Sequence, residues 1–159
     1  YTLSGICYIP TFIMFLNLID GMKNGKFLLG YIFIASWGTD VFAYCIGRRF
    51  GKHKFSKVSP KKSIEGCIAG TIGSTVLALI YTIILNNVLT FEYSYFIVGI
   101  SGIALSLIGQ LGDFSASCIK RYVDIKDYSN LLPGHGGMLD RIDSVLFIAP
   151  FAYMLFTII

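Results

Sequence analysis

The sequence predicts an all-α, polytopic integral membrane helix bundle with about five transmembrane helices. Three observations lead to this fold class. Hydrophobic residues make up 55% of the 159 residues, charged residues only 14%, and the mean hydropathy is +0.70, whereas soluble chains contain about 25% charged residues. Five apolar stretches approach the ~20 residues that a helix needs to cross the hydrocarbon core. None of them alternates apolar and polar residues with the period of two typical of a barrel wall.

The five apolar stretches run roughly over residues 4–19, 27–46, 67–85, 95–111 and from 142 to the C-terminus. In the third, Gly66, Gly70 and Ser74 recur at a spacing of four, which predicts close packing against another helix. The composition excludes disorder, a nucleic-acid-binding tail and a disulfide-stapled secreted module. The chain starts at Tyr1, and neither a basic n-region nor a cleavage site precedes the first apolar run. We therefore expect a piece of a longer membrane protein rather than a signal peptide.

Basic residues gather in two of the four connecting segments. Segment 47–66 contains seven Lys or Arg and segment 112–141 contains four, whereas the other two connections contain only Lys23 and Lys26. Because basic connections stay cytoplasmic, both long segments are expected on the cytoplasmic side.

Acidic residues lie in or beside the predicted spans, all toward the same side of the membrane as the basic segments. They are Asp40, Asp113, Asp140 and Asp143. A carboxylate in this setting is costly and needs a partner or a function. A helix cap or a buried ion pair explains any one of them, but four at a single membrane face favour a functional site.

If the fourth helix continues beyond residue 111, several polar residues share one stripe, because their offsets of 0, 4, 7 and 11 match helical periods. They are Asp113, Ser117, Lys120 and Asp124, with Arg121 beside them. Asp140 and Asp143, three residues apart, share a face at the start of the next helix. Carboxylates from two helices with Lys and Arg nearby are typical of sites that hold Mg²⁺ and phosphate oxygens.

The segment between these two helices, Leu132-Pro133-Gly134-His135-Gly136-Gly137, is not predicted to be helical because of its Pro and three Gly. Such a loop lets backbone N–H groups approach an anion, as phosphate-binding loops do, and it also suits a flexible turn. His135 either acts as a general base or positions the loop by hydrogen bonding, and we favour the positioning role.

Two stretches of the sequence together resemble a known family. The first is Ser117-x-Ile119-Lys120-Arg121, four residues, Lys126-Asp127-x-Ser129, then Leu132-Pro133-x-His135-Gly136-Gly137-Met138-x-Asp140-Arg141-Ile142-Asp143. It resembles the signature of phosphatidate cytidylyltransferases, also called CDP-diacylglycerol synthases. The second runs from Asp40 to Gly66 and has Ser63 where the common form has Thr, so the hydroxyl is kept.

The resemblance implies a polytopic enzyme of phospholipid biosynthesis that transfers CMP from CTP to phosphatidate, giving CDP-diacylglycerol and pyrophosphate. It implies a requirement for Mg²⁺, with a second cation, monovalent or divalent, as a further expectation. It also implies a homodimer in the inner membrane of a bacterium, with the active site toward the cytoplasm and no nucleic-acid partner. Residues 1–159 would be the C-terminal transmembrane catalytic portion, with N-terminal transmembrane helices missing.

The resemblance also assigns roles to individual residues. As metal ligands it implies Asp113 and Asp140, with Asp143 in support. As phosphate-holding residues it implies Lys120, Arg121 and Arg141, with Ser117 orienting a phosphate or a metal-bound water. On the nucleotide side it implies Lys61, Lys62, Ser63 and Glu65, together with the loop residues His135, Gly136 and Gly137. Asp40 would organise the basic loop.

Two alternatives stay open at this point. A CTP-dependent polyprenol or phytol kinase also binds CTP at a membrane, although the run from His135 to Asp143 and the preceding Ser117–Arg121 stretch favour the cytidylyltransferase. A transporter that uses intramembrane carboxylates belongs to a different class. The clustering of charge at one face argues against it.

Overall fold

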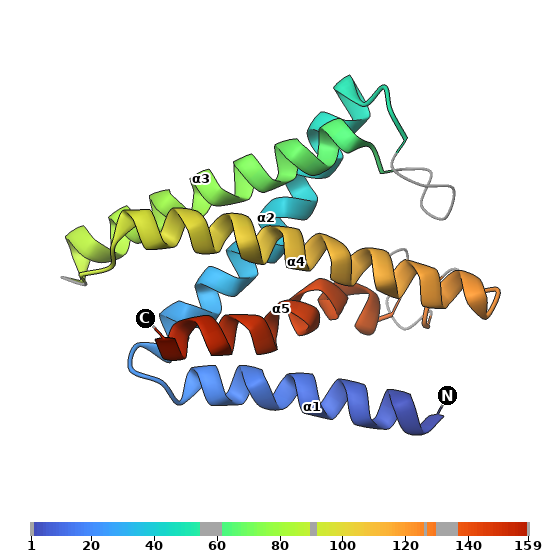
Figure 1. Cartoon of the computed structure of the whole chain (residues 1–159), viewed down its shortest axis with the longest axis horizontal. Coiled ribbons are helices and arrows are strands. Elements are labelled where there is room, and N and C mark those ends of the chain that lie inside the picture. Colours follow the sequence, from blue (N-terminus) through green and yellow to red (C-terminus); the bar gives the residue numbers. More distant parts are fainter. Residues whose placement is uncertain (1, 55–61, 90–91, 126, 130–136, 159) are drawn as a thin grey trace.

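The computed structural model is a bundle of five helices (Figure 1). It describes residues 2–54, 62–89, 92–125, 127–129 and 137–158, with side chains described from residue 8 onward. The helices are α1 (Thr2–Asp20), α2 (Gly25–Phe50), α3 (Ile64–Val88), α4 (Tyr95–Tyr122) and α5 (Leu139–Ile158). Within these residues the only β-type pairing is an isolated bridge between Lys54 and Ser63. The all-α prediction is confirmed.

Four helices, α2 to α5, are long and apolar enough to cross a membrane. By the same criterion α1 contributes only a shorter apolar helix, Tyr8–Asp20, among the residues whose side chains are described. The prediction of five helices is therefore confirmed, and four of them have the length and composition of a multi-pass membrane protein.

Helix α4 is longer than the apolar stretch that predicts it. Its 28 residues rise about 42 Å, more than the ~30 Å of a hydrocarbon core. The extra turns carry Asp113, Ser117 and Lys120 on one continuous helix, as expected. Asp124 lies beyond the helix end with a left-handed backbone (φ 58°) and does not continue the stripe.

Helices α2 and α3 form the most extensive helix–helix contact of the bundle. A Cβ on Gly66 would lie 2.7 Å from the Ala43 carbonyl oxygen, and a Cβ on Gly70 would lie 2.8 Å from that of Thr39. With Ser74 buried on the same face, the spacing of small residues lets the two backbones approach closely. The predicted packing role of this pattern is confirmed.

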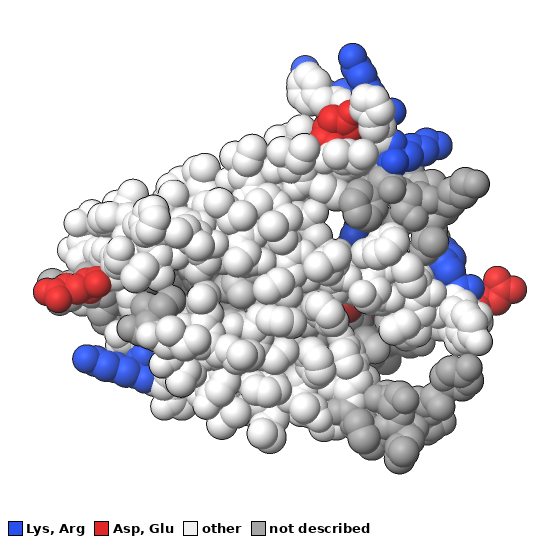
Figure 2. All heavy atoms as spheres, viewed as in Figure 1, with Lys and Arg blue, Asp and Glu red and all other residues white. Residues whose placement is uncertain are grey.

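The bundle buries several small polar residues beside its apolar core and leaves many large apolar residues exposed. Buried positions include Ser36, Thr39 and Ser106, whereas large apolar side chains spaced by four along α3 are exposed. These exposed residues are Ile68, Ile72, Val76 and Ile80. Figure 2 shows the result as a broad uncharged band between two charged ends. This distribution suits lipid, which offers no hydrophobic drive for burying large apolar side chains.

The α2–α3 and α4–α5 connections lie at the same end of the bundle, on the right in Figure 1, and the α1–α2 and α3–α4 connections lie at the other. Both charge-rich segments predicted from the sequence therefore flank one end. We call it the charged end, defined by Asp40, Lys62, Asp113, Lys120, Asp140 and Asp143.

Candidate functional site

Two ion pairs connect the segments that meet at the charged end. The Lys62 ammonium, just before α3, contacts Asp113 Oδ2 on α4, and each side chain is about a quarter exposed. The Lys120 Nζ of α4 lies 2.7 Å from Asp140 Oδ1 at the start of α5. The structure thus brings predicted carboxylates and predicted cations together, but it pairs Lys62 with Asp113, which the sequence did not indicate.

Asp140 is the most heavily engaged carboxylate of the charged end. Besides Lys120, its Oδ2 accepts hydrogen bonds from the backbone N–H groups of Tyr128 and Gly137, both at 3.0 Å. Its side chain is 5% exposed and that of Lys120 is 12% exposed. Removing one partner of such a buried ion pair strongly destabilises the folded protein. Asp140 therefore ties α5 to α4 and to both described flanks of the α4–α5 connection.

The structure gives a reason for glycine at position 137 of the loop. A Cβ at this position would lie 2.9 Å from the Ser129 nitrogen and 3.0 Å from Asp140 Oδ2. The residue is also buried. The missing side chain lets the Gly137 backbone approach an anionic group, here the Asp140 carboxylate. Gly136 and His135 lie outside the described residues, so their predicted roles stay predictions.

Tyr128 is a site residue that the sequence did not reveal. Its ring lies under the Lys120 ammonium, 5.3 Å from nitrogen to centroid, and its hydroxyl donates to the Ala116 carbonyl at 3.5 Å. Burial raises the pKa of the Tyr128 hydroxyl above its ordinary value, so the group stays neutral. A lone Tyr among Asp127 and Ser129 has no spacing that signals this role; only the fold places it beneath Lys120.

Asp143 is a buried carboxylate, 7% exposed, whose Oδ1 accepts hydrogen bonds from the N–H and the hydroxyl of Ser144. No cation contacts it within the part of the chain that the structure describes. Its charge interacts with that of Asp113, and the charge of Asp40 on α2 interacts with both. Three carboxylates from three helices therefore lie within electrostatic reach of one another, and Lys62 forms an ion pair with one of them, Asp113.

This donor set suits a divalent cation. Among the described residues no three His, Cys, Asp or Glu side chains are grouped closely enough to hold one ion. Mg²⁺, however, is normally bound through one or two carboxylates, with waters and substrate phosphates completing the octahedron. The excess of carboxylates around Asp113 and Asp143 fits that mode. The assignment of Asp113, Asp140 and Asp143 as metal ligands remains a prediction.

The remaining predicted residues lie at the same end but take different contacts. Arg121 is exposed, with a long contact of 3.4 Å to the Ile125 carbonyl, and Ser117 is half-buried between Asp113 and Lys120. The Arg141 side chain is exposed, and its carbonyl accepts from the Trp37 indole at 3.4 Å. Lys61 lies outside the described residues.

Ser63 and Glu65, predicted for the nucleotide side, serve the start of α3 in the structure. The Ser63 hydroxyl accepts from the Gly66 N–H at 3.1 Å and is the N-cap of the helix. The Glu65 carboxylate is engaged by His53 at 2.6 Å. Among the described residues, neither Ser63 nor Glu65 contacts a member of the two ion pairs directly.

A polar network inside the bundle sets the register of the helices that carry the site. The Thr39 hydroxyl of α2 lies 2.7 Å from that of Ser106 on α4, and Ser106 reaches the Thr71 hydroxyl of α3 at 3.3 Å. Gln110 of α4 donates to Thr71 at 2.9 Å. The network ends one residue before Asp40 and three before Asp113, so it holds α2 and α4 in a fixed relation near these carboxylates.

A cavity of about 780 Å³ opens at the other end of the bundle, among residues that include Lys23, Tyr31, Tyr81, Glu92 and Ser101. The Tyr31 hydroxyl is already paired with Ser101 at 2.6 Å, and Tyr81 donates to the Phe27 carbonyl at 3.1 Å. The lining of the cavity includes one basic and one acidic residue, Lys23 and Glu92, whereas the four carboxylates and two lysines that define the charged end lie elsewhere. We place the candidate site at the charged end.

Comparison with known proteins identifies relatives of the whole chain. Phosphatidate cytidylyltransferase of Bacillus subtilis (strain 168) is 38% identical over 155 residues, which is 97% of this chain and 56% of the relative. The enzyme of the same name from Haemophilus influenzae is 46% identical over 132 residues, 80% of this chain and 45% of the relative. That from Thermotoga maritima is 38% identical over 130 residues, 80% of this chain and 48% of the relative. The chain spans about half the length of these relatives.

The model of the cytidylyltransferase family matches residues 1–159, the whole of the sequence. The match includes all five helices and every charged-end residue. The chain belongs to the cytidylyltransferase family.

Proposed function

We propose that this protein transfers CMP from CTP to phosphatidate, giving CDP-diacylglycerol and pyrophosphate. One observation carries the proposal: in a member of the cytidylyltransferase family, carboxylates and lysines from α2, α4, α5 and the start of α3 meet at one end of an apolar bundle. A lipid phosphate and a nucleotide triphosphate can meet only where an apolar surface adjoins a charged one.

The arrangement suits phosphoryl chemistry with an anionic nucleophile. The phosphatidate oxygen is already ionised at neutral pH, so the reaction needs alignment and charge neutralisation rather than a strong base. Lys62, Lys120 and Arg121 would neutralise and orient phosphate oxygens. Tyr128 keeps Lys120 at the α4–α5 junction, and Asp140 keeps the flanks of the connection in place.

Asp113, Asp140 and Asp143 are the residues that would hold Mg²⁺, which when bound neutralises phosphate charge and polarises the phosphoryl group. Asp140 already accepts three hydrogen bonds, and a carboxylate has about four acceptor sites. Asp113 and Asp143 keep more capacity free, so we expect them to contribute at least as much as Asp140.

We further propose that the charged end faces the cytoplasm of a bacterium across its inner membrane. Eleven of the thirteen Lys and Arg residues lie in segments 47–66 and 112–141, which flank this end. Basic residues there attract anionic lipids, each contributing about 1 kcal/mol near the surface. A homodimer and a second cation belong to the same proposal and rest on the family resemblance.

The position of a label in CTP tests the proposed reaction. Membranes containing the full-length protein receive phosphatidate, Mg²⁺ and CTP labelled at either the α- or the γ-phosphorus. CMP transfer places the α label in the lipid fraction and releases the γ label as pyrophosphate. A γ label in the lipid would instead identify a CTP-dependent kinase, and no lipid label with either substrate would reject both enzymes.

A further inference from the structure

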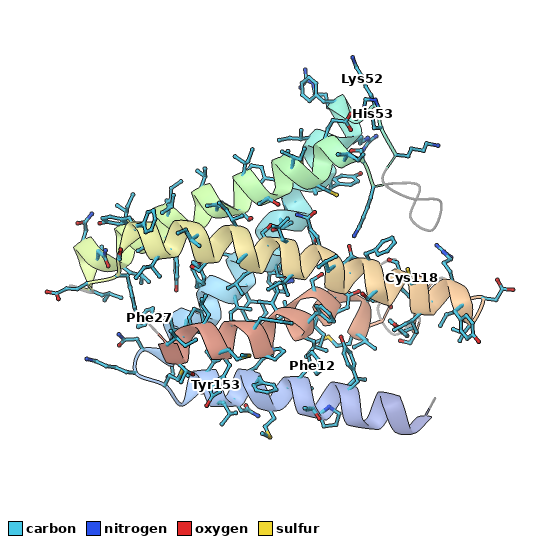
Figure 3. All side chains as sticks on the ribbon, in the orientation of Figure 1. Phe12, Phe27, Lys52, His53, Cys118 and Tyr153 are labelled. Atoms are coloured by element: carbon cyan, nitrogen blue, oxygen red, sulfur yellow. The ribbon has the colours of Figure 1, made fainter. Side chains whose placement is uncertain are left out.

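At the junction between α2 and α3, His53 contacts the first turn of α3. Its backbone N–H donates to both carboxylate oxygens of Glu65, at 3.2 and 3.3 Å, and its ring Nδ1 lies 2.6 Å from Oε1. Its carbonyl accepts from the Ile64 N–H at 3.0 Å. We call these contacts the clasp. Figure 3 places His53 beside Lys52, at the end of the bundle away from Phe27.

The clasp continues into a closely packed joint. Lys54 and Ser63 form an antiparallel bridge directly beside it. Ser63 in turn lies against the last turn of α2, because a Cβ on Gly47 would be 2.9 Å from its hydroxyl and one on Gly51 would be 2.7 Å from its Cβ. The backbone just before α3 is therefore fixed relative to both helices, although the His53 side chain itself is 75% exposed.

Lys62 is the residue immediately before this joint, and its ammonium contacts Asp113 of α4. A Lys side chain has a flexible stem of four carbons and loses much conformational freedom when it is held in one place. When the Lys62 backbone is already fixed, forming the ion pair costs less conformational entropy. The clasp therefore favours the ion pair between the Lys62 ammonium and Asp113 over a Lys62 side chain that is free in water.

We propose that His53 is a positioning residue of the candidate site, which acts through Glu65 and the start of α3 to hold Lys62 against Asp113. This inference rests on the proposed function for its catalytic consequence and on the contacts alone for its structural one. It also gives Glu65 a different role from the nucleotide contact predicted by resemblance, because its carboxylate is occupied by His53.

Kinetics of the full-length protein test the catalytic consequence. His53→Ala should lower kcat/KM about fivefold, at the upper end of what an exposed side-chain pair contributes. His53→Asn, which keeps a donor near the position of Nδ1, should restore most of the loss. Lys52→Ala removes a side chain from the same turn but keeps its backbone N–H, and should leave the rate unchanged.

A double-mutant cycle separates positioning of Lys62 from a general defect. In a Lys62→Ala background, His53→Ala should cost nothing further, since the side chain it positions is gone. In a Lys120→Ala background, the fivefold loss should persist, because that lysine is held by α5. A full fivefold loss on top of Lys62→Ala would overturn the proposal, as would a wild-type rate for His53→Ala.

Labelling of lysines with an amine-reactive reagent tests the structural consequence without any activity. Lys62, paired with Asp113, should react several-fold faster in His53→Ala than in the unaltered protein, while Lys52 reacts equally in both. Unchanged labelling of Lys62 would overturn the proposal. If the unaltered protein forms no lipid product from CTP, the proposed function fails, and the labelling experiment still decides the role of the clasp.

Discussion

The two ion pairs of the charged end differ in how firmly the protein holds them. Lys120 and Asp140 are almost buried, and backbone N–H groups and the Tyr128 ring surround them. Lys62 and Asp113 are each about a quarter exposed, and Lys62 precedes α3 in a connection whose described part is joined to α3 at the clasp. The difference suggests a division of labour: the α4–α5 half is a scaffold, and the Lys62–Asp113 half exchanges partners with substrate.

The largest expected effects come from the carboxylates themselves. Asp113→Asn and Asp140→Asn should each lower turnover by orders of magnitude, because both remove charge from the site. Asp140→Asn should also destabilise the fold, by about 3 kcal/mol, since it leaves the buried Lys120 without a charged partner. Thermal unfolding in detergent measured beside the initial rate checks both parts. Near-normal turnover of either Asn variant at saturating Mg²⁺ would contradict the assignment.

Substitutions of the basic residues should have the next largest effects, and the more buried residue should be the more sensitive. Lys120→Ala should reduce both stability and turnover, whereas Arg121→Ala, at an exposed position, should raise the apparent KM for substrate and leave unfolding unchanged. Arg121→Lys should recover only part of the loss, because a Lys lacks the bidentate geometry of a guanidinium. Steady-state kinetics in mixed micelles measure these effects. Unaltered kinetics for both Ala variants would show that the two residues only set the orientation of the protein in the membrane.

A pair of glycine substitutions separates the scaffold from the lipid-facing surface. Gly137→Ala should lower activity about tenfold or more, because its Cβ would lie 2.9 Å from the Ser129 nitrogen and 3.0 Å from Asp140 Oδ2. Gly99→Ala in α4 meets no atom within 4 Å and should be neutral or slightly stabilising. Activity and thermal unfolding of the two variants are compared side by side. Equal behaviour would show that the loop backbone is a simple connector.

The smallest effect is expected in the polar network. Thr71→Val removes the hydroxyl that accepts from Gln110 and Ser106, and an interhelical hydrogen bond in a membrane protein contributes about 0.6 kcal/mol on average. Thr71→Ser keeps the hydroxyl and is the matched control. We expect a small decrease in thermal stability for Val and none for Ser. A large loss of activity with Val would mean that the network controls the charged end more tightly than its contacts indicate.

The fold was largely predictable because its signals are local. Apolar length gave the helices, and the spacing of Gly66, Gly70 and Ser74 gave the α2–α3 contact. The limits of α4 were not predictable from hydropathy, because its last turns are polar and continue as a helix beyond the hydrocarbon region. That continuation is what brings Asp113 and Lys120 onto one helix.

The site was predictable in its membership and less so in its contacts. The sequence grouped Asp113, Lys120 and Asp140, but whether a lysine faces a phosphate or a carboxylate depends on distances that no spacing encodes. The pairing of Lys62 with Asp113 joins residues 51 positions apart. Tyr128 and His53 make side-chain contacts with Lys120 and Glu65, residues eight and twelve positions away, and no spacing in the sequence indicates that the fold brings these side chains together.

Binding of a metal–nucleotide complex tests most directly the claim that the charged end, and not the opposite cavity, is the active site. Mn²⁺ prefers the same oxygen ligands as Mg²⁺ and can be followed by the electron paramagnetic resonance signal of the free ion. Full-length protein with CTP should bind Mn²⁺, Asp113→Asn should lose this binding, and Glu92→Gln, at the cavity of the other end, should retain it. Retained binding in Asp113→Asn together with loss in Glu92→Gln would contradict the account.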